Sequence, residues 1–226
     1  MSVIIQQFGE RGILLSWQQK IDEKTSKKVH FYNQRIKDQL SDFIIETVTT
    51  YCSLMVLIKQ SQNYHFVNIV KMEIEKIVLE TPKFETIESK FWKIPVCYDL
   101  SFGQDLQSLS QQKNLTIDDI IKLHCEPVYT VSFIGFLPGF PYLQGLNPKL
   151  ITPRLSTPRL SVAKGSVAIG GSQTGIYPQQ SPGGWHIIGR TPLEFFNTKK
   201  STPCILQPMD SIQFYPISLE EFKDVR

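Results

Sequence analysis

Three arginines stand out because their spacing and their neighbours suit the binding of a small anion. Arg154 and Arg159 lie in ITPRLSTPRL, in which TPRL occurs twice and each arginine directly follows a proline. Because proline fixes its own φ, both guanidinium groups are presented from a stiff backbone. A guanidinium group can bind a carboxylate, carbamate or phosphate through two hydrogen bonds. We expect a functional or interface role for at least one of them; the alternative is a pair of solvated surface arginines.

The third arginine, Arg190, ends the run QQSPGGWHIIGR. We expect the Pro-Gly-Gly segment in this run to form a sharp turn. At least one of Gly183 and Gly184 should then have φ above zero, a conformation that glycine adopts readily. The strand after the turn would bring Arg190 to a polar rim that it shares with Arg154 or Arg159.

An amide and a phenol accompany the arginines. The run GGSQTGIYP contains Gln173 and Tyr177, and its glycines let a ligand approach the backbone closely. This combination of groups suits a small carboxylate or amide ligand. The predicted substrate-binding residues are Arg154, Arg159, Gln173, Tyr177 and Arg190.

The run FLPGFPYLQGL places aromatic side chains on a stiff, turning backbone. Its prolines exclude a continuous strand, since proline cannot donate to a ladder. Two interpretations remain open: an aromatic plug over the mouth of a barrel, or the wall of a binding cleft. The predicted binding-loop residues, which include a second segment further along the chain, are Phe136, Pro138, Gly139, Phe140, Pro141, Ser181, Gly183, Gly184, Trp185 and His186.

Signatures of self-contained catalysis are absent from the sequence. There is no GxxxxGK[ST] phosphate loop, no HExxH and no paired CxxC, so we predict no metal site. Ser172 lacks the spacing of a nucleophile elbow. His124-Cys125 is interpreted as a buried helix end. No catalytic residue is assigned, and we expect a chain that catalyses only with partners.

The composition and charge of the chain argue against several classes of protein. The chain has 226 residues and a net charge of +3 without a basic block, which argues against nucleic acid as a partner. No apolar run approaches the roughly 20 residues that span a bilayer, and the first residues do not resemble a signal peptide. The four cysteines are far apart, which favours reduced thiols in a cytoplasm. We therefore predict a cytoplasmic protein with no membrane or nucleic-acid partner.

Glycine and proline divide the chain into two predicted domains, 1–84 and 85–226. Most of both residue types follow residue 126, so the first part is built from longer elements. VIIQQFG and GILLSW predict a strand pair, and residues 21–40 a helix. FIIETVTTY and LMVLIK predict two more strands, and residues 63–79 a second helix. The predicted order is ββαββα.

The sequence of the second part, residues 85–226, predicts short strands separated by turns. FWKIPVCYD predicts the first strand, followed by helices near 104–111 and 117–124. Thr116 and Asp119 have the form of a capping box. The further predicted strands are VYTVSFIGF, SVAIGG, TGIYP, WHIIG, LEFF, CILQ and SIQFYPI. This pattern indicates a closed barrel or a sandwich, and an α+β class for the whole chain.

Four of these runs together resemble a known family. FIGFLPGFPYLQGL, TPRLSTPR, GSVAIGGSQTGIYP and SPGGWHIIGRTP are similar to the family that is variously called the 5-oxoprolinase B subunit, allophanate hydrolase subunit 1 and kinase-A inhibitor. The resemblance begins at IPVCYD, continues through GQDL and covers most of the second domain. One departure is Asp99-Leu100-Ser101, where the family usually has a glycine pair; it lies outside the predicted site.

The resemblance implies a cyclophilin-like β-barrel after the ββαββα sandwich. It also implies a subunit of an ATP-dependent 5-oxoprolinase, a hydrolase that converts 5-oxo-L-proline to L-glutamate. The implied partners are a homologous C subunit, together with an amidohydrolase-like A subunit, and ATP would be bound in the complex rather than by this chain alone. The alternatives are an inhibitor that binds a sporulation histidine kinase, and a carboxyl-transfer component of a system like urea amidolyase.

Overall fold

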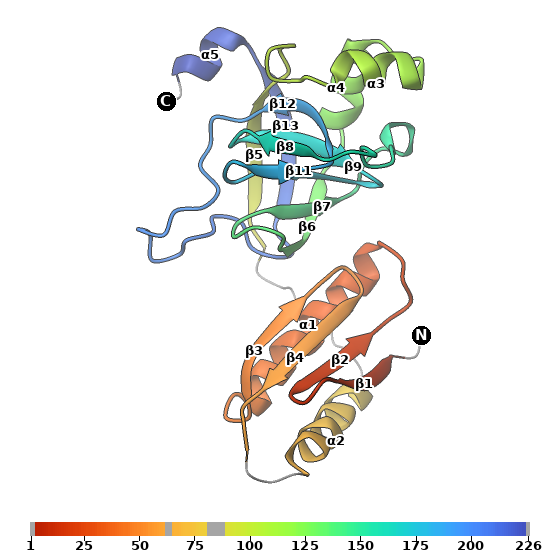
Figure 1. The fold of residues 1–226 in the computed structure, drawn as a ribbon, viewed down its shortest axis with the longest axis vertical. Coiled ribbons are helices and arrows are strands. Elements are labelled where there is room, and N and C mark those ends of the chain that lie inside the picture. Colours follow the sequence, from red (N-terminus) through yellow and green to blue (C-terminus); the bar gives the residue numbers. More distant parts are fainter. Residues whose placement is uncertain (1–2, 62–64, 81–88, 225–226) are drawn as a thin grey trace. The chain divides into compact units, whose positions relative to one another are not determined.

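The computed structural model describes residues 3–61, 65–80 and 89–224 (Figure 1). Its internal contacts divide the chain into two compact units, Met1–Ile87 and Glu88–Arg226. The predicted boundary between residues 84 and 85 lies outside the described residues and stays a prediction.

The first unit is an antiparallel sheet with two helices on one face, and its order confirms the predicted ββαββα pattern. The strands pair in the order β1-β2-β4-β3. The elements are β1 (Ile4–Phe8), β2 (Gly12–Ser16), α1 (Glu23–Leu40), β3 (Ile44–Thr49), β4 (Ser53–Ile58) and α2 (Phe66–Leu79). In β4 the buried side chains alternate, as in a strand with one face on a core. That face packs against α1 and α2 in one apolar cluster.

The helix boundaries differ slightly from the predicted ones. The first helix begins at Glu23 rather than at residue 21, because the Asp22 side chain accepts a hydrogen bond from the backbone N–H of Thr25 at 2.9 Å. Such an N-cap satisfies a donor that the first turn leaves without a partner. The second helix begins at Phe66; its predicted start at residue 63 lies outside the described residues.

The second unit is a closed β-barrel, which decides between the two predicted architectures. Neighbouring strands follow the order β10-β7-β6-β13-β5-β12-β9, and β11 pairs with β8 in a separate two-stranded sheet. The strands are β5 (Phe91–Cys97), β6 (Tyr129–Ile134), β7 (Pro141–Gln144), β8 (Arg159–Val162), β9 (Ser166–Gly170), β10 (Gln173–Ile176), β11 (Ser181–Gly183), β12 (His186–Arg190) and β13 (Ser211–Ile217). The remaining elements are α3 (Leu106–Lys113), α4 (Ile117–Cys125), a short 3-10 helix at Pro148–Leu150, and α5 (Leu219–Asp224).

The predicted start of α4 is confirmed. The Thr116 side chain accepts the backbone N–H of Asp119, and the Asp119 carboxylate accepts the backbone N–H of Thr116, both at 3.1 Å. This reciprocal capping box holds α4 at the position from which His124 enters the barrel core.

A hydrogen-bonded chain of side chains crosses the barrel interior through His124, which is completely buried. Its Nδ1 lies 2.7 Å from the Tyr98 hydroxyl and its Nε2 lies 2.9 Å from Thr174 Oγ1. The Thr174 hydroxyl donates to the carbonyl of Ala168. Burial lowers the pKa of His124 from 6.5 to about 3, so the imidazole is neutral. The interpretation of His124 as a buried helix end is correct, and the network gives it a structural role.

Two predicted strands are wrong. The LEFF and CILQ segments, residues 193–196 and 204–207, form no strand and meet only through an isolated bridge between Phe196 and Cys204. The physical reason is that β5 already pairs with β12 on one side and with β13 on the other. The barrel therefore closes without these segments and offers them no free edge.

The predicted Pro-Gly-Gly turn is also wrong. Ser181–Gly183 is strand β11, paired with β8. Neither Gly183 nor Gly184 is among the described glycines with positive φ, which are Gly9, Gly139, Gly145, Gly165 and Gly171. Pairing keeps this segment extended, and Gly183 is needed for another reason: a Cβ there would lie 2.3 Å from the Tyr177 hydroxyl oxygen.

No helix within the part of the chain that the structure describes is long and apolar enough to cross a membrane. Within the same residues, no group of three or more His, Cys, Asp or Glu side chains could hold a metal ion.

Candidate functional site

An aromatic cluster packs on the outer face of the barrel beside strands β7, β9 and β10. It consists of Phe140, Tyr142, Tyr177 and Trp185, and all of these rings except Tyr142 are buried. The ring of Phe140 lies 4.9 Å from Tyr142, 5.2 Å from Tyr177 and 5.5 Å from Trp185, measured between centroids. Tyr142 and Trp185 are 5.7 Å apart in an edge-to-face arrangement. Such pairs are favourable geometries for aromatic rings and make the surface rigid.

The strand register explains why these rings gather here. Tyr142 lies opposite Gly175, and Gln173 lies opposite Gly170. Because side chains alternate between the two faces of a strand, Tyr142, Gln173 and the two glycine positions share the outer face of the barrel. The absent side chain of Gly170 leaves room for Trp185, whose ring atoms would lie 2.5 Å from a Cβ built on that glycine. Trp185 therefore lies directly beside Gln173.

Arg154 is the positive charge of this surface. It is exposed, and its guanidinium carbon lies 5.8 Å from the centroid of the Trp185 ring, a cation–π geometry. Burial raises the pKa of both Tyr142 and Tyr177, while the charge of Arg154 lowers each in part. Both phenols therefore stay protonated at neutral pH and can donate hydrogen bonds.

Gln173 contributes an amide nitrogen that has no hydrogen-bond partner within the described residues. The side chain is 6% exposed, and its Nε2 is buried without a partner. A buried donor without an acceptor costs about 1–3 kcal/mol relative to a satisfied one. Arg154 and Gln173 thus provide a cation and an amide donor near one indole ring.

Arg159 has a different role from Arg154. Its Nη2 forms an ion pair with Oδ1 of Asp105 at 2.6 Å, and the other carboxylate oxygen accepts the backbone N–H of Ile187. Asp105 is nearly buried, and it is the N-cap residue of α3. The pair thus ties β8 and α3 to strand β12. Its carboxylate partner already occupies the guanidinium group that was predicted to bind substrate.

We expect Arg159→Ala to lower the free energy of unfolding by about 2 kcal/mol, because it leaves the nearly buried Asp105 carboxylate without its cation. Arg154→Ala is the matched control and should melt close to the wild type, since Arg154 is exposed and forms no salt bridge within the described residues. Urea unfolding of both variants measures the difference. Equal midpoints would contradict the structural role of Arg159.

Arg190 lies at the end of β12 and contacts other residues than Arg154 and Arg159 do. Its Nε donates to the carbonyl of Lys164 at 2.8 Å, and its guanidinium carbon lies 5.5 Å from the Phe102 ring. It ends β12, whereas His186 at the start of that strand bonds to Pro153 beside Arg154. The length of β12 thus separates Arg190 from Trp185, and a rim that Arg190 shares with Arg154 or Arg159 stays a prediction.

The other predicted contacts are divided between the core and the surface. Tyr177 and Trp185 are buried within the aromatic cluster. The Ser181 hydroxyl donates to the carbonyl of Pro182, and His186 Nε2 bonds to the carbonyl of Pro153 at 2.9 Å. Since a carbonyl only accepts, Nε2 carries a proton, while the buried Nδ1 has no hydrogen-bond partner within the described residues. Gly184 packs at ordinary contact distance against Pro158.

The predicted binding loop carries one exposed aromatic side chain on a strained backbone. Phe136 has φ +66 and is 60% exposed, with its ring edge-on to Phe140 at 5.6 Å. Pro138 is exposed, and Gly139 has φ +84 where a Cβ would meet Phe196. Pro141 is the first residue of β7, a position that tolerates proline. The loop thus shares features of both interpretations, a packed inner ring and an exposed outer one.

Asp105 was not predicted from the sequence, and Tyr142 was predicted only as part of the aromatic run that could line a binding cleft. Asp105 is 54 residues from Arg159 and 82 residues from Ile187, and no local pattern joins such distant positions. Tyr142 follows Pro141 inside the aromatic run, and its alternation with Leu143 could have placed it on the outer face.

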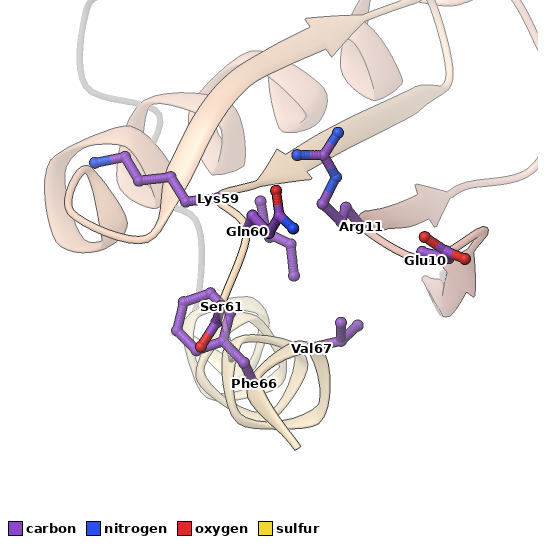
Figure 2. A pocket seen from close by; sticks show the side chains of 8 residues that line it. Glu10, Arg11, Lys59, Gln60, Ser61, Phe66 and Val67 are labelled. Atoms are coloured by element: carbon purple, nitrogen blue, oxygen red, sulfur yellow. The ribbon is translucent and has the colours of Figure 1, made fainter. Parts of the chain in front are cut away.

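The first unit has a cavity of about 510 Å³ near the start of α2 (Figure 2). Its lining includes Arg11 and Lys59, whose charged groups point in different directions in Figure 2. The Lys59 ammonium lies 3.4 Å from the carbonyl of Ser41. None of the predicted site residues lines this cavity, and its two cations do not converge on a common point.

Comparison with known proteins shows the family of this chain. The family model described as "Carboxyltransferase domain, subdomain C and D" matches residues 3–206, and the chain belongs to this family. Proteins named as the B subunit of 5-oxoprolinase are among its relatives, which confirms the resemblance seen in the sequence. The relative from Bacillus subtilis (strain 168) is 32% identical over 226 residues, 96% of this chain and 94% of that protein. The relative from Haemophilus influenzae is 46% identical over 138 residues, 61% of this chain and 65% of that protein.

Solved structures support the fold. A shorter match to urea amidolyase bears on the carboxyl-transfer alternative. The crystal structure of TTHA0988 has a TM-score of 0.78 and 27% identity to this chain. The match covers 92% of this chain but only 40% of TTHA0988, so this chain corresponds to less than half of that protein. Urea amidolyase from Lachancea kluyveri is 40% identical over 58 residues, which are 24% of this chain and 3% of that protein.

Proposed function

We propose that this chain is a non-autonomous subunit of an ATP-dependent 5-oxoprolinase, which opens 5-oxo-L-proline to L-glutamate. The observation that carries the proposal is the match to the B subunit of the Bacillus subtilis 5-oxoprolinase across nearly the whole length of both chains. The outer surface of the barrel supports it, because Arg154 and Gln173 suit a small amide that bears a carboxylate.

The chemistry assigned to this chain is binding and orientation. The predicted partners, the homologous C subunit with the amidohydrolase-like A subunit, would complete the reaction. ATP does not fit the described residues of this chain: the sequence lacks a phosphate loop, and the free cation of the aromatic surface is a single exposed arginine. We therefore assign the nucleotide to the partners. The four cysteines are free thiols, which is consistent with the proposed cytoplasmic location.

Reconstitution tests the proposal directly. We expect the purified chain to give no turnover by itself, and to give ATP-dependent glutamate release from 5-oxo-L-proline when it is mixed with these two partners from the same organism. The control is the mixture of the two partners without this chain. Full activity of that control, or turnover by a homogeneous preparation of this chain, would contradict the proposal.

The two alternatives have narrower support. The kinase-inhibitor alternative rests on the exposed Phe136 ring, which is held out by an unusual backbone conformation, and it stays a prediction. The carboxyl-transfer alternative rests on the family description and on the short match to urea amidolyase. The longer matches to proteins of the 5-oxoprolinase family favour the main proposal over both.

A further inference from the structure

Gln173 is a buried donor that the described residues leave without an acceptor. It lies on β10, opposite Gly170, and its Nε2 has no partner although the side chain is only 6% exposed. Buried amide groups are almost always hydrogen-bonded, so an unsatisfied one needs an explanation. A ligand that brings a carbonyl oxygen to this nitrogen would remove the penalty.

Arg154 is a cation without a carboxylate partner within the described residues, unlike Arg159. Its guanidinium carbon lies over the Trp185 ring, and Pro153 precedes it in the chain. An exposed guanidinium without a carboxylate partner can bind a ligand carboxylate through two hydrogen bonds.

The fold brings these two groups to the same indole ring. The segment that carries Arg154 is fixed beside β9 and β10 by the bridge between Thr152 and Gly171. Gln173 follows Gly171 by two residues, and the Trp185 ring lies on Gly170 directly across from it. The indole therefore lies under the Arg154 guanidinium and on the glycine that pairs with Gln173.

We propose that Arg154 and Gln173 divide the recognition of a cyclic amide that bears a carboxylate. Arg154 binds the carboxylate, and Gln173 Nε2 donates to the amide carbonyl. Because Nε2 is covered and Trp185 is only 4% exposed, the Gln173 amide must turn outward when the ligand enters. This assignment rests on the proposed function for the identity of the ligand, and it excludes Arg159 and Arg190 from direct contact.

Calorimetric titration of the purified chain with three compounds tests the assignment. The compounds are 5-oxo-L-proline, 2-pyrrolidinone, which lacks the carboxylate, and L-proline, which lacks the amide carbonyl. We expect Arg154→Gln to weaken the binding of 5-oxo-L-proline by about tenfold or more, because one charged contact is lost, and to leave the affinity for 2-pyrrolidinone unchanged. Gln173→Leu should weaken the binding of 5-oxo-L-proline by about tenfold and leave the affinity for L-proline unchanged.

Arg190→Gln is the matched control, because it removes the same charge away from the aromatic cluster and should bind all three compounds like the wild type. Thermal melts establish that each variant is folded. The assignment is overturned if the wild type binds none of the compounds, or if either variant weakens all of them equally. Turnover in the reconstituted complex without this binding pattern would overturn the assignment and leave the proposed function standing. The binding pattern without turnover in the reconstituted complex would support the assignment and contradict the proposed function.

Discussion

Replacing Gly183 with valine should lower the free energy of unfolding by about 3 kcal/mol, whereas the same change at Gly184 should have little effect. A Cβ at Gly183 would lie 2.3 Å from the Tyr177 hydroxyl oxygen and 2.8 Å from two of its ring carbons. Tyr177 cannot give way, because it is buried and packed against Phe140 at 5.2 Å. Forcing extra atoms into a packed site typically costs about 1–3 kcal/mol, and here the aromatic cluster must also shift.

Gly184 provides the matched control. A Cβ there would meet Pro158 at 3.6 Å, an ordinary contact, and its φ is not in the left-handed region. Urea unfolding of Gly183→Val and Gly184→Val at one pH measures the difference. If Gly184→Val is the less stable variant, then the segment is the sharp turn that its sequence suggests, and the pairing of β11 with β8 is wrong.

This pair of glycines shows where local sequence signals stop. Pro-Gly-Gly is a turn signal because proline and glycine favour turn conformations in isolation. In the folded chain, β8 supplies a partner for residues 181–183, and the hydrogen bonds of that pairing override the local preference. The glycine is then required by the ring of Tyr177, a contact that no turn rule describes.

The elements that could be predicted are those whose pattern is local. The alternating burial of β4 and the helical stripe of α1 are visible in the sequence, because one side of each element faces a core. The capping box of α4 depends on residues three positions apart. Barrel closure is not local: LEFF and CILQ have the composition of strands, but the edges that they would need are already paired.

The candidate site was predictable in its residue types and not in its pairings. Arg154, Arg159 and Arg190 are chemically equivalent in the sequence, and only long-range contacts distinguish them. Arg159 is paired with Asp105, and Arg190 is held by the Lys164 carbonyl and the Phe102 ring. Arg154 remains exposed because no carboxylate of the described residues reaches it. The difference between a structural and a binding arginine therefore depends on its neighbours in space.

The buried His124 should make the stability of the barrel depend on pH. In the unfolded chain a histidine titrates near 6.5, whereas burial lowers the pKa of His124 in the folded chain to about 3. Between these values the unfolded chain binds a proton that the folded chain does not. The contribution of His124 is therefore fully present above pH 6.5 and is progressively lost as the pH falls toward 3.

The hydrogen bonds explain why the folded protein resists this proton. The Thr174 hydroxyl donates to the Ala168 carbonyl, so it must accept from His124 Nε2, and His124 Nδ1 then accepts from the Tyr98 hydroxyl. Both ring nitrogens are satisfied only in the neutral tautomer with the proton on Nε2. A second proton would place a charge in the barrel interior without a carboxylate partner in this network.

Urea unfolding at pH 7 and at pH 5 measures the effect. The His124 contribution should fall by about 2 kcal/mol over this interval, since each pKa unit between the two states corresponds to about 1.4 kcal/mol. The control is His124→Gln, which cannot titrate; it should be less stable than the wild type at pH 7, because it does not reproduce both hydrogen bonds. Carboxylates titrate in both proteins, so the stability difference between wild type and variant isolates His124, and that difference should shrink by about 2 kcal/mol at pH 5. A difference that stays constant from pH 7 to pH 5 would show that His124 is protonated in the folded barrel or reaches solvent, and the tautomer assigned from Thr174 and Tyr98 would be wrong.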